Sequence, residues 1–317
     1  MSNKSVKKIV VFTQNRNFFG AQIVHIPLLK LLRSAYPNSN ITIFSKHKIS
    51  QLLVELKAAD RLVLEEDKMQ TYKRYMQINP DITVSLRQRS LLLSAALFVL
   101  NRKMKIGFSS FANRLLFTKT ASSMQNIYRA CNYTHLAQEC LELPPLEDVD
   151  KDESNEGKIL IFPGAGGEEK IWPLENFIAV ASTLHKKTKR RVAFVLGEKE
   201  RPFADRIREN CEADIYMNLP IEELFSVVKS ASLVIANDCG PSHIAHILDK
   251  KRVVLFSDAD YKAKQTIAEW FKESPFARYV VSKAGEGMES ISSKSVLKEA
   301  QTLLESSPQR NSKDKKL

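Results

Sequence analysis

The chain has 317 residues, of which 44% are hydrophobic, and a formal net charge of +12. This length suits two domains of ordinary size, and the composition excludes a fibrous or wholly disordered protein. The apolar run Ile9–Phe12 that follows Lys7 and Lys8 is too short for the core of a signal peptide, so we expect a cytoplasmic protein.

The charge is unevenly distributed. Residues 1–138 contain 21 Lys and Arg against 6 Asp and Glu, a net charge of +15, whereas the remaining residues contain 27 against 30, a net charge of −3. No carboxylate lies between Ile82 and Gln138. Such a field favours an anionic partner or surface, and the simpler alternative is a solvated basic face without a partner.

The first half alternates short β-branched runs with longer amphipathic stretches. Strands are expected at 8–13, 41–45, 61–64, 82–86 and 105–108, with helices at 20–35, 48–59, 67–78 and 89–101. This repeated βα pattern predicts a parallel sheet covered on both faces. The apolar run Leu91–Leu100 is too short to cross a bilayer and predicts a buried helix.

A domain boundary is expected near residue 150. A further helix is predicted at 122–142, and the acidic stretch Glu147–Gly157 that follows Pro144 and Pro145 is typical of a linker. We therefore expect domains at 1–150 and 151–317, with a frayed tail at 306–317, where Lys and Ser accompany no apolar face.

The second half repeats the alternation. Strands are expected at 158–162, 191–196, 214–217, 232–236, 252–257 and 278–282, and helices at 173–187, 199–210, 220–230, 241–249, 262–272 and 290–305. Two Rossmann-like, doubly wound domains facing a cleft are the predicted architecture. The four cysteines form no C-x-x-C pair and show no metal-ligand spacing with the histidines, so no metal site is expected.

Two loops of the second half combine glycine with a helix start. In the run 162–173, Gly164, Gly166 and Gly167 allow close backbone approach, and Lys170 supplies a cation for a departing diphosphate. In the run 237–243, Pro241 suits the first turn of a helix and leaves the amides of Gly240, Ser242 and His243 free to face an anion. Either loop alone also fits a plain strand-to-helix turn. Together, at one sheet edge, they indicate a nucleotide diphosphate site.

The segments P-G-A-G-G-E-E-K-I-W-P (163–173) and N-D-C-G-P-S-H-I-A-H (237–246), with Leu196–Glu200 between them, resemble glycosyltransferase family 9, the ADP-heptose heptosyltransferases of the lipopolysaccharide inner core. The stretch Phe19–Leu29, followed by Tyr36 and Pro37, is similar to the opening G-D-x-x-x-x-x-P-x-L of that family and its later F-P. The resemblance covers residues 8–283, more strongly after 158. It implies a GT-B fold, an acceptor held by the N-terminal domain, a sugar nucleotide held by the C-terminal domain, inversion at the anomeric carbon, and no essential metal or resident cofactor.

The resemblance also implies roles for single residues. Lys170 would hold the donor phosphates, Glu200 would contact the ribose or adenine side, and the segment with Asp238, Cys239, Gly240 and His243 would cradle the diphosphate and sugar. Structural alternatives remain for two of them, because Asp238 is also suited to cap a helix and His243 to pack in its first turn.

One position departs from the family pattern. Counting back from Pro27, Ala21 stands where the family has its general-base aspartate, and alanine accepts no proton. A positioned base contributes about 100 to 10,000-fold in rate. His25, one turn further along, is the nearest replacement and is equally suited to packing. We therefore list Lys170, Asp238 and His25 as candidate catalytic residues and keep a catalytically silent sugar-nucleotide-binding homologue as the alternative.

Basic residues follow several predicted strands of the first half and indicate that the acceptor is anionic. They are expected to meet at the rim of the cleft and to bind an anionic glycolipid, such as Kdo-bearing lipid A or a phosphorylated core, at the inner face of the cytoplasmic membrane: Arg16, Lys46, Lys48, Arg87 and Arg89. Nucleic acid is not expected as a partner, because the aromatic residues do not interleave with the basic ones. A sugar-nucleotide epimerase of similar architecture has no separate support.

Overall fold

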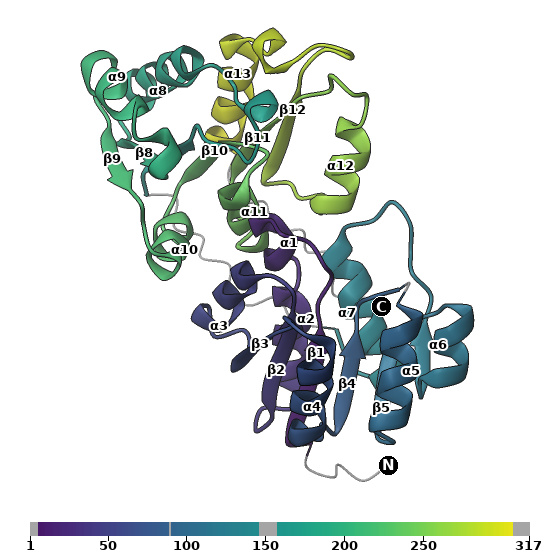
Figure 1. Ribbon diagram of the computed structural model, residues 1–317. Helices are drawn as coiled ribbons and strands as arrows, with labels where there is room; N and C mark the ends of the chain where they lie inside the picture. Colours follow the sequence, from purple (N-terminus) through teal and green to yellow (C-terminus); the bar gives the residue numbers. More distant parts are fainter. Residues whose placement is uncertain (1–5, 89, 146–156, 307–317) are drawn as a thin grey trace. The chain divides into compact units, whose positions relative to one another are not determined.

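The computed structural model describes residues 6–88, 90–145 and 157–306, and it divides into two compact units. The first unit contains the described residues before the gap at 146–156 together with Ala268–Trp270, and the second contains the rest. Most of the predicted linker and nearly all of the predicted tail lie outside the described residues. Each unit is built on its own six-stranded parallel sheet (Figure 1).

The sheet of the first unit has the order β3-β2-β1-β4-β5-β6, and every neighbouring pair is parallel. Its strands are β1 (Lys8–Phe12), β2 (Asn40–Ser45), β3 (Arg61–Leu64), β4 (Ile82–Ser85), β5 (Met104–Phe108) and β6 (Lys119–Ala121). The chain moves from β1 outward to β3 and then returns to the other side of β1 at β4. The carboxyl ends of β1 and β4 therefore form the topological switch point, where sheets of this type bind ligands.

Helices connect these strands, and short elements depart from the expectations. The helices are α1 (Phe19–Ile23), α2 (Ile26–Ala35), α3 (Leu52–Glu55), α4 (Lys68–Ile78), α5 (Leu91–Leu100), α6 (Phe111–Leu116) and α7 (Arg129–Leu141), with a 3₁₀ turn at Lys48–Gln51. The single helix expected at 20–35 is interrupted, because Pro27 has no N–H to donate and its ring conflicts with the carbonyl of Ile23.

The helix expected from residue 122 begins only at Arg129. Upstream of it, the side chain of Asn132 accepts a hydrogen bond from the Met124 amide and donates one to the Met124 carbonyl, each at 2.8 Å. These bonds occupy the backbone groups that a longer helix would use. The elements α6 and β6 were not predicted, because six and three residues are too few for a periodic signal.

The second unit has the sheet order β12-β11-β10-β7-β8-β9, again all parallel. Its strands are β7 (Ile159–Phe162), β8 (Val192–Leu196), β9 (Asp214–Met217), β10 (Leu233–Asn237), β11 (Arg252–Phe256) and β12 (Ala277–Val281). Its helices are α8 (Leu174–Thr188), α9 (Phe203–Asn210), α10 (Ile221–Lys229), α11 (Gly240–Ile247), α12 (Ala263–Trp270) and α13 (Ser293–Glu305), with 3₁₀ turns at Glu168–Lys170, Glu198–Glu200 and Met288–Ser290. The switch point lies at the carboxyl ends of β7 and β10.

The central strands of the second unit supply its core. Every residue of β7, β8, β10 and β11 is buried, which is the near-continuous burial expected where helices cover both faces of a parallel sheet. Each large apolar side chain removed from water in this way stabilises the fold by about 1.5–3 kcal/mol. The strands are thus rigid supports for the loops at their ends.

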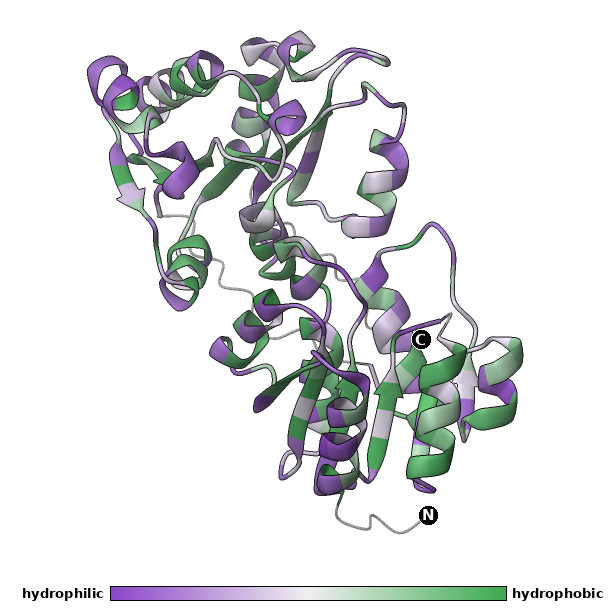
Figure 2. Cartoon of the chain, in the orientation of Figure 1, coloured by the Kyte–Doolittle hydropathy of each residue, from purple (hydrophilic) through white to green (hydrophobic). Residues whose placement is uncertain are grey.

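The helix α5 corrects the expectation of a buried helix. Leu93, Ser94 and Leu97 pack inward, but four large apolar side chains on its other side are 51% to 75% exposed: Leu91, Leu92, Phe98 and Val99. Figure 2 shows α5 as hydrophobic along its length. Among the described residues, none of the helices combines the length and apolar character that crossing a bilayer requires.

The buried ring of His25 predicts a pH dependence of stability. Burial lowers the pKa of His25 to about 4, against about 6.5 in an unfolded chain. Between these values the unfolded chain binds one more proton, so the free energy of unfolding falls by about 2 kcal/mol as the pH falls from 7 to 5. His25→Gln should remove this part of the pH dependence, measured by urea unfolding at both pH values.

The variant retains His246, whose pKa is also lowered by burial and by Arg252, so a smaller dependence should persist. An unchanged pH dependence in the His25→Gln protein would contradict the assignment.

Candidate functional site

A buried asparagine joins the two loops at the switch point of the second unit. Asn237, the last residue of β10, is fully buried; its amide group donates to the Pro163 carbonyl at 2.8 Å, and its side-chain oxygen accepts from the Trp172 amide at 3.3 Å. The Trp172 indole is itself buried and donates to the Ile291 carbonyl at 3.0 Å. Both ends of the loop after β7 are therefore fixed against β10.

This arrangement brings Lys170 to the end of β10. The Lys170 Nζ lies 2.7 Å from the Asp238 Oδ2, although the two residues are 68 positions apart in the chain. The Lys170 side chain is 42% exposed and that of Asp238 is 12% exposed. The ammonium group of Lys170 is therefore accessible to an anion from solvent, whereas the Asp238 carboxylate is nearly buried.

The first turn of α11 begins directly after Asp238. Cys239 is its N-cap, Pro241 lies at its start as expected, and the amides of a first helical turn lack partners within the helix. The hydroxyl of Ser242 accepts from the Cys239 amide at 3.3 Å and donates to the Cys239 carbonyl at 2.7 Å. The Ser242 side chain therefore shapes the turn, and any contribution to anion binding comes from its backbone.

Two further side chains of this turn are buried. The ring of His243 stacks on Phe271 at 4.6 Å between centroids, and its Nε2 lies 4.0 Å from the Asp238 Oδ1. Burial raises the pKa of the Cys239 thiol to about 12, so this cysteine stays a neutral thiol. Asp238 thus has a cation on one side and an imidazole on the other.

The loops after β7 and β8 also meet. A Cβ added at Gly164 would lie 2.4 Å from the Glu200 Oε1, so a larger residue at position 164 would require the Glu200 side chain to move. The Glu200 carboxylate accepts from the Gly197 amide at 3.1 Å, which fixes its orientation. Gly166 differs, because an added Cβ would meet no atom within 4 Å, and at Gly167 it would meet only the flexible Glu169 side chain. The space beside Gly166 is open to a ligand.

The predicted acceptor-binding residues lie at the carboxyl edge of the first sheet. Because β2, β1 and β4 are neighbours, the loops carrying Lys46, Arg16 and Arg87 leave the same edge. Arg16, Lys46 and Lys48 are exposed, and Arg89 lies outside the described residues. These cations are placed where a ligand of the first unit would be expected.

Arg87 has a structural task at that edge. It forms a two-pronged ion pair with Glu65, and its Nε donates to the Thr13 carbonyl at 2.8 Å. Both side chains of the pair are less than 10% exposed. The pair ties together the loops after β1, β3 and β4, so we do not count Arg87 among the cations free to meet an anion.

The position of the missing base is buried. Ala21 lies in α1 and is 2% exposed, and its methyl group accepts no proton. His25 is 1% exposed; its Nδ1 lies 3.1 Å from the Gln22 carbonyl, and its ring stacks on Tyr133. With its pKa lowered to about 4, His25 is a weak base enclosed in the core. The conformation described here does not favour His25 as the proton acceptor, and that role stays a prediction.

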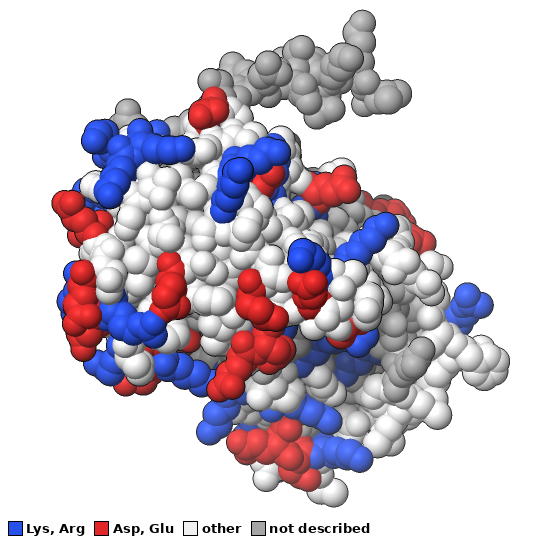
Figure 3. Space-filling view, turned by 90° about the horizontal axis from the view of Figure 1, so that it is seen from above, with Lys and Arg blue, Asp and Glu red and all other residues white. Residues whose placement is uncertain are grey.

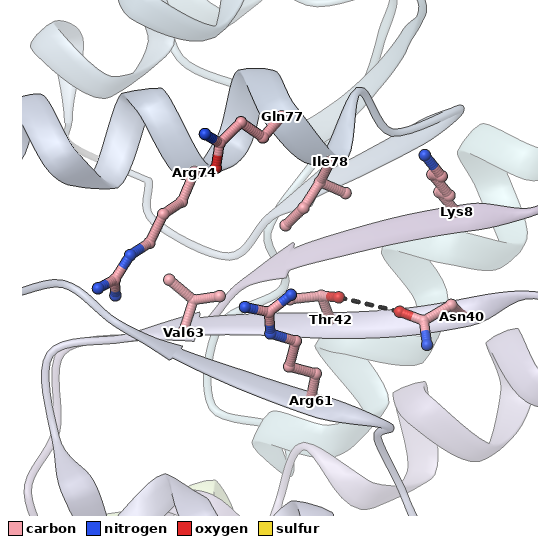
Figure 4. Close-up of a pocket in the computed structure, with 8 residues that line it drawn as sticks. All are labelled: Lys8, Asn40, Thr42, Arg61, Val63, Arg74, Gln77 and Ile78. Atoms are coloured by element: carbon pink, nitrogen blue, oxygen red, sulfur yellow. Dashed lines mark hydrogen bonds between the residues drawn. The ribbon is translucent and has the colours of Figure 1, made fainter.

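A separate hollow of 280 Å³ lies at the opposite, amino edge of the first sheet (Figure 4). Lys8, Arg61 and Arg74 stand around it. Ligands of doubly wound sheets bind at the carboxyl edge, so this hollow is not the candidate site. Among the described residues, no three His, Cys, Asp or Glu side chains are grouped so that they could share a metal ion.

The sequence did not predict that the Asn237 side chain would bond to the Pro163 carbonyl and the Trp172 amide, although Asn237 lies within the second motif. A polar residue at the end of an otherwise apolar, buried strand was the available signal. Charge gave no comparable signal on the face shown in Figure 3, where Lys and Arg are interspersed with Asp and Glu. The candidate site is therefore recognised by particular residue pairs, such as Lys170 and Asp238.

Comparisons with known proteins agree with this geometry. A sequence model of glycosyltransferase family 9 (heptosyltransferase) matches residues 80–272, which include both loops of the second unit. Lipopolysaccharide heptosyltransferase 1 of Campylobacter coli is 32% identical over 110 residues, a match that spans 32% of this chain and 32% of that protein.

Two solved structures resemble nearly the whole chain. The E. coli heptosyltransferase WaaC, solved with ADP, has a TM-score of 0.71 at 14% identity and covers 93% of this chain and 99% of its own. The glycosyl transferase family 9 protein from Veillonella parvula DSM 2008 has a TM-score of 0.69 at 19% identity, covering 96% and 98%. At such identities the likeness shows the fold, GT-B. Because the family model matches more than half of the residues, the chain belongs to glycosyltransferase family 9.

Proposed function

We propose that this protein transfers a heptose, or a related sugar, from ADP-heptose to an anionic acceptor of the lipopolysaccharide inner core, with inversion at the anomeric carbon. The observation that carries the proposal is the Lys170–Asp238 pair beside the first turn of α11, at the switch point of the second unit. Family membership supports the reaction class. The likeness to a heptosyltransferase solved with ADP supports the donor.

The donor chemistry follows from the charges. In the reaction the bond between the anomeric carbon and the diphosphate oxygen breaks, the acceptor oxygen bonds to that carbon from the opposite face, and the hydroxyl proton leaves to a base. Negative charge develops on the departing diphosphate. Lys170 and the first-turn amides of α11, beginning at Gly240, would stabilise that charge, with the diphosphate entering over Gly166. Glu200 would contact the nucleoside. No resident metal or cofactor takes part in this proposal.

The acceptor side rests on the exposed cations of the first unit. Arg16, Lys46 and Lys48 would pair with the carboxylates and phosphates of a glycolipid such as Kdo-bearing lipid A or a phosphorylated core. Such an acceptor lies in the inner face of the cytoplasmic membrane, so we propose that the protein works in the cytoplasm at that surface. Nucleic acid is not part of the proposal.

A second candidate function follows from Ala21. With a methyl group at the position of the family's base, and His25 enclosed in the core, the protein would bind a sugar nucleotide without turning it over. This alternative predicts the same donor site and differs only in catalysis. Measurements of donor binding and of transfer therefore separate the two.

Replacing the site lysine should weaken donor binding. Lys170→Met keeps the aliphatic stem but removes a charge-assisted hydrogen bond worth about 1.5–3 kcal/mol. The dissociation constant for ADP, measured by calorimetric titration, should rise about 10 to 100-fold. Lys199→Met removes an exposed lysine from the neighbouring 3₁₀ turn and should leave it unchanged. Equal affinities for wild type and Lys170→Met would remove the proposed donor site.

Restoring a carboxylate at position 21 should raise transfer. A base at this position is expected to increase the rate by about 100-fold or more. The measurement is turnover of ADP-heptose with a Kdo-bearing acceptor by wild type, Ala21→Asp and the uncharged control Ala21→Asn. Only the aspartate variant should gain activity.

Because Ala21 is buried, unfolding temperatures and ADP affinities of both variants must first match the wild type. If a well-folded Ala21→Asp protein binds ADP normally and transfers no faster, position 21 does not face the reacting hydroxyl. If the substitution abolishes a robust wild-type activity, the protein uses another base.

A further inference from the structure

The helix α5 presents an apolar face that none of the described residues of the first unit covers. Four large apolar side chains of α5 are exposed: Leu91, Leu92, Phe98 and Val99. Because the second pair follows the first by seven residues, which is two helical turns, all four lie on one side of the helix. The opposite side, with Leu93 and Leu97, packs into the core. Exposed apolar clusters of this kind mark interaction sites.

The neighbouring helix α6 extends this surface. Phe111 is 86% exposed and Leu115 is 69% exposed, and they lie one turn apart. The side chains of Ser94 and Asn113 join the two helices at 2.6 Å, and Asn113 also donates to the Phe108 carbonyl at 2.8 Å. We call the six exposed apolar side chains the α5–α6 face: Leu91, Leu92, Phe98, Val99, Phe111 and Leu115.

The charges around the α5–α6 face are positive. Arg102 follows the end of α5 and Arg114 lies between Phe111 and Leu115 on α6; both are exposed, and neither forms an ion pair with a described residue. The sequence from Ile82 to Gln138 contains no Asp or Glu. An occupant of this surface must therefore combine an apolar interior with negative charge at its border.

We propose that the α5–α6 face docks on an anionic lipid bilayer. The apolar side chains enter the boundary between head groups and acyl chains, and Arg102 and Arg114 pair with phosphate groups at the same level. The inference goes beyond the donor site, because it needs neither a nucleotide nor a reaction.

A second copy of this chain fits the surface less well. A two-fold contact would place the α5–α6 face against itself, because symmetric dimers use the same patch on both subunits. Each Arg114, standing between Phe111 and Leu115, would then approach positive charge in an apolar contact. Like charges brought together in this way oppose association.

The position of the face agrees with a lipid-borne substrate. The helices α5 and α6 follow β4 and β5, so Leu91, Leu92 and Phe111 start at the carboxyl edge of the sheet. The exposed cations Arg16 and Lys46 leave the same edge. A bilayer bound at the start of these helices lies beside the loops proposed to receive the acceptor.

Vesicle cosedimentation of the full chain, without donor or acceptor, tests the apolar contact. Wild type should bind vesicles of phosphatidylcholine with phosphatidylglycerol more tightly than phosphatidylcholine alone. Leu92→Gln combined with Val99→Gln should lower the partition coefficient at least about tenfold. The matched control is Met69→Gln combined with Met76→Gln, which removes exposed apolar side chains from α4 and should change little.

The charges are tested separately. Arg102→Gln and Arg114→Gln should each lower binding to the anionic vesicles about fivefold and reduce its sensitivity to salt. Lys68→Gln with Lys73→Gln, exposed on α4, is the control.

Insertion of the apolar face is tested by tryptophan fluorescence. Phe111→Trp should show a blue-shifted emission with anionic vesicles, whereas Met69→Trp should not.

Three results would overturn the docking proposal. One is equal vesicle binding by the glutamine variants and the wild type, with melting temperatures unchanged. Another is a wild type that does not bind anionic vesicles at all. The third is sedimentation equilibrium showing a dimer that Leu92→Gln with Val99→Gln dissociates, because the face would then bind a second copy. None of these outcomes bears on ADP binding at Lys170, so the proposed donor site and sugar transfer are judged independently. Only the proposed location at the membrane surface is tested together with the docking.

Discussion

The candidate donor site depends on the two hydrogen bonds made by the buried Asn237 side chain. An unpaired backbone group in such a place costs about 1–3 kcal/mol, so the Pro163 carbonyl and the Trp172 amide hold the loop after β7 firmly against β10. Lys170 stands between these two anchors, and Asp238 follows Asn237 directly. The ion pair between Lys170 and Asp238 is therefore a consequence of the Asn237 contacts, and so is the position of the ammonium group beside the first turn of α11.

In the absence of a ligand, the charges of this site are balanced internally. Asp238 engages Lys170 and approaches His243, so the first turn of α11 is flanked by a neutralised pair. An incoming diphosphate would offer the half-exposed Lys170 a more highly charged partner, while the nearly buried Asp238 would keep His243 as its neighbour at 4.0 Å. Cys239 adds no charge to this balance, because burial raises the pKa of its thiol to about 12 and keeps it neutral. Under the proposed function, the site would stabilise a leaving group electrostatically, with a mobile cation and fixed amides.

The sequence predicted the order of the large elements and the two loops that follow β7 and β10, because buried parallel strands have continuous apolar runs and the loops between them carry glycine and proline. The donor-binding roles of the loop residues stay predictions. The sequence was less informative about features that depend on tertiary contacts, such as the partner of a charged residue or the buried face of a helix. The partner of Arg87 is Glu65, 22 residues away, and only the adjacent carboxyl ends of β3, β2, β1 and β4 bring them into reach. The run Leu91–Leu100 has so few polar residues that every face of the helix looks buried; which face meets the core depends on the packing of α5 against the sheet and α6. Ala21 and His25 are both buried although the helix is interrupted between α1 and α2, an interruption that the expected continuous helix at 20–35 did not include.

The exposed apolar side of α5 also changes which partner the positive charge of the first half is expected to bind. A uniform positive field attracts any polyanion, whereas an apolar face bordered by Arg102 and Arg114 selects a surface that offers hydrocarbon as well as charge. The parallel topology also places the start of α5 near the acceptor loops. The helix after each strand begins at the carboxyl edge of the sheet, where Arg16, Lys46 and Lys48 are exposed. A bilayer held there would present the head of an anionic glycolipid to these cations without requiring it to leave the membrane. If both proposals hold, the charge excess of the first unit would serve two neighbouring functions, binding the lipid surface and binding the acceptor, at one edge of one sheet.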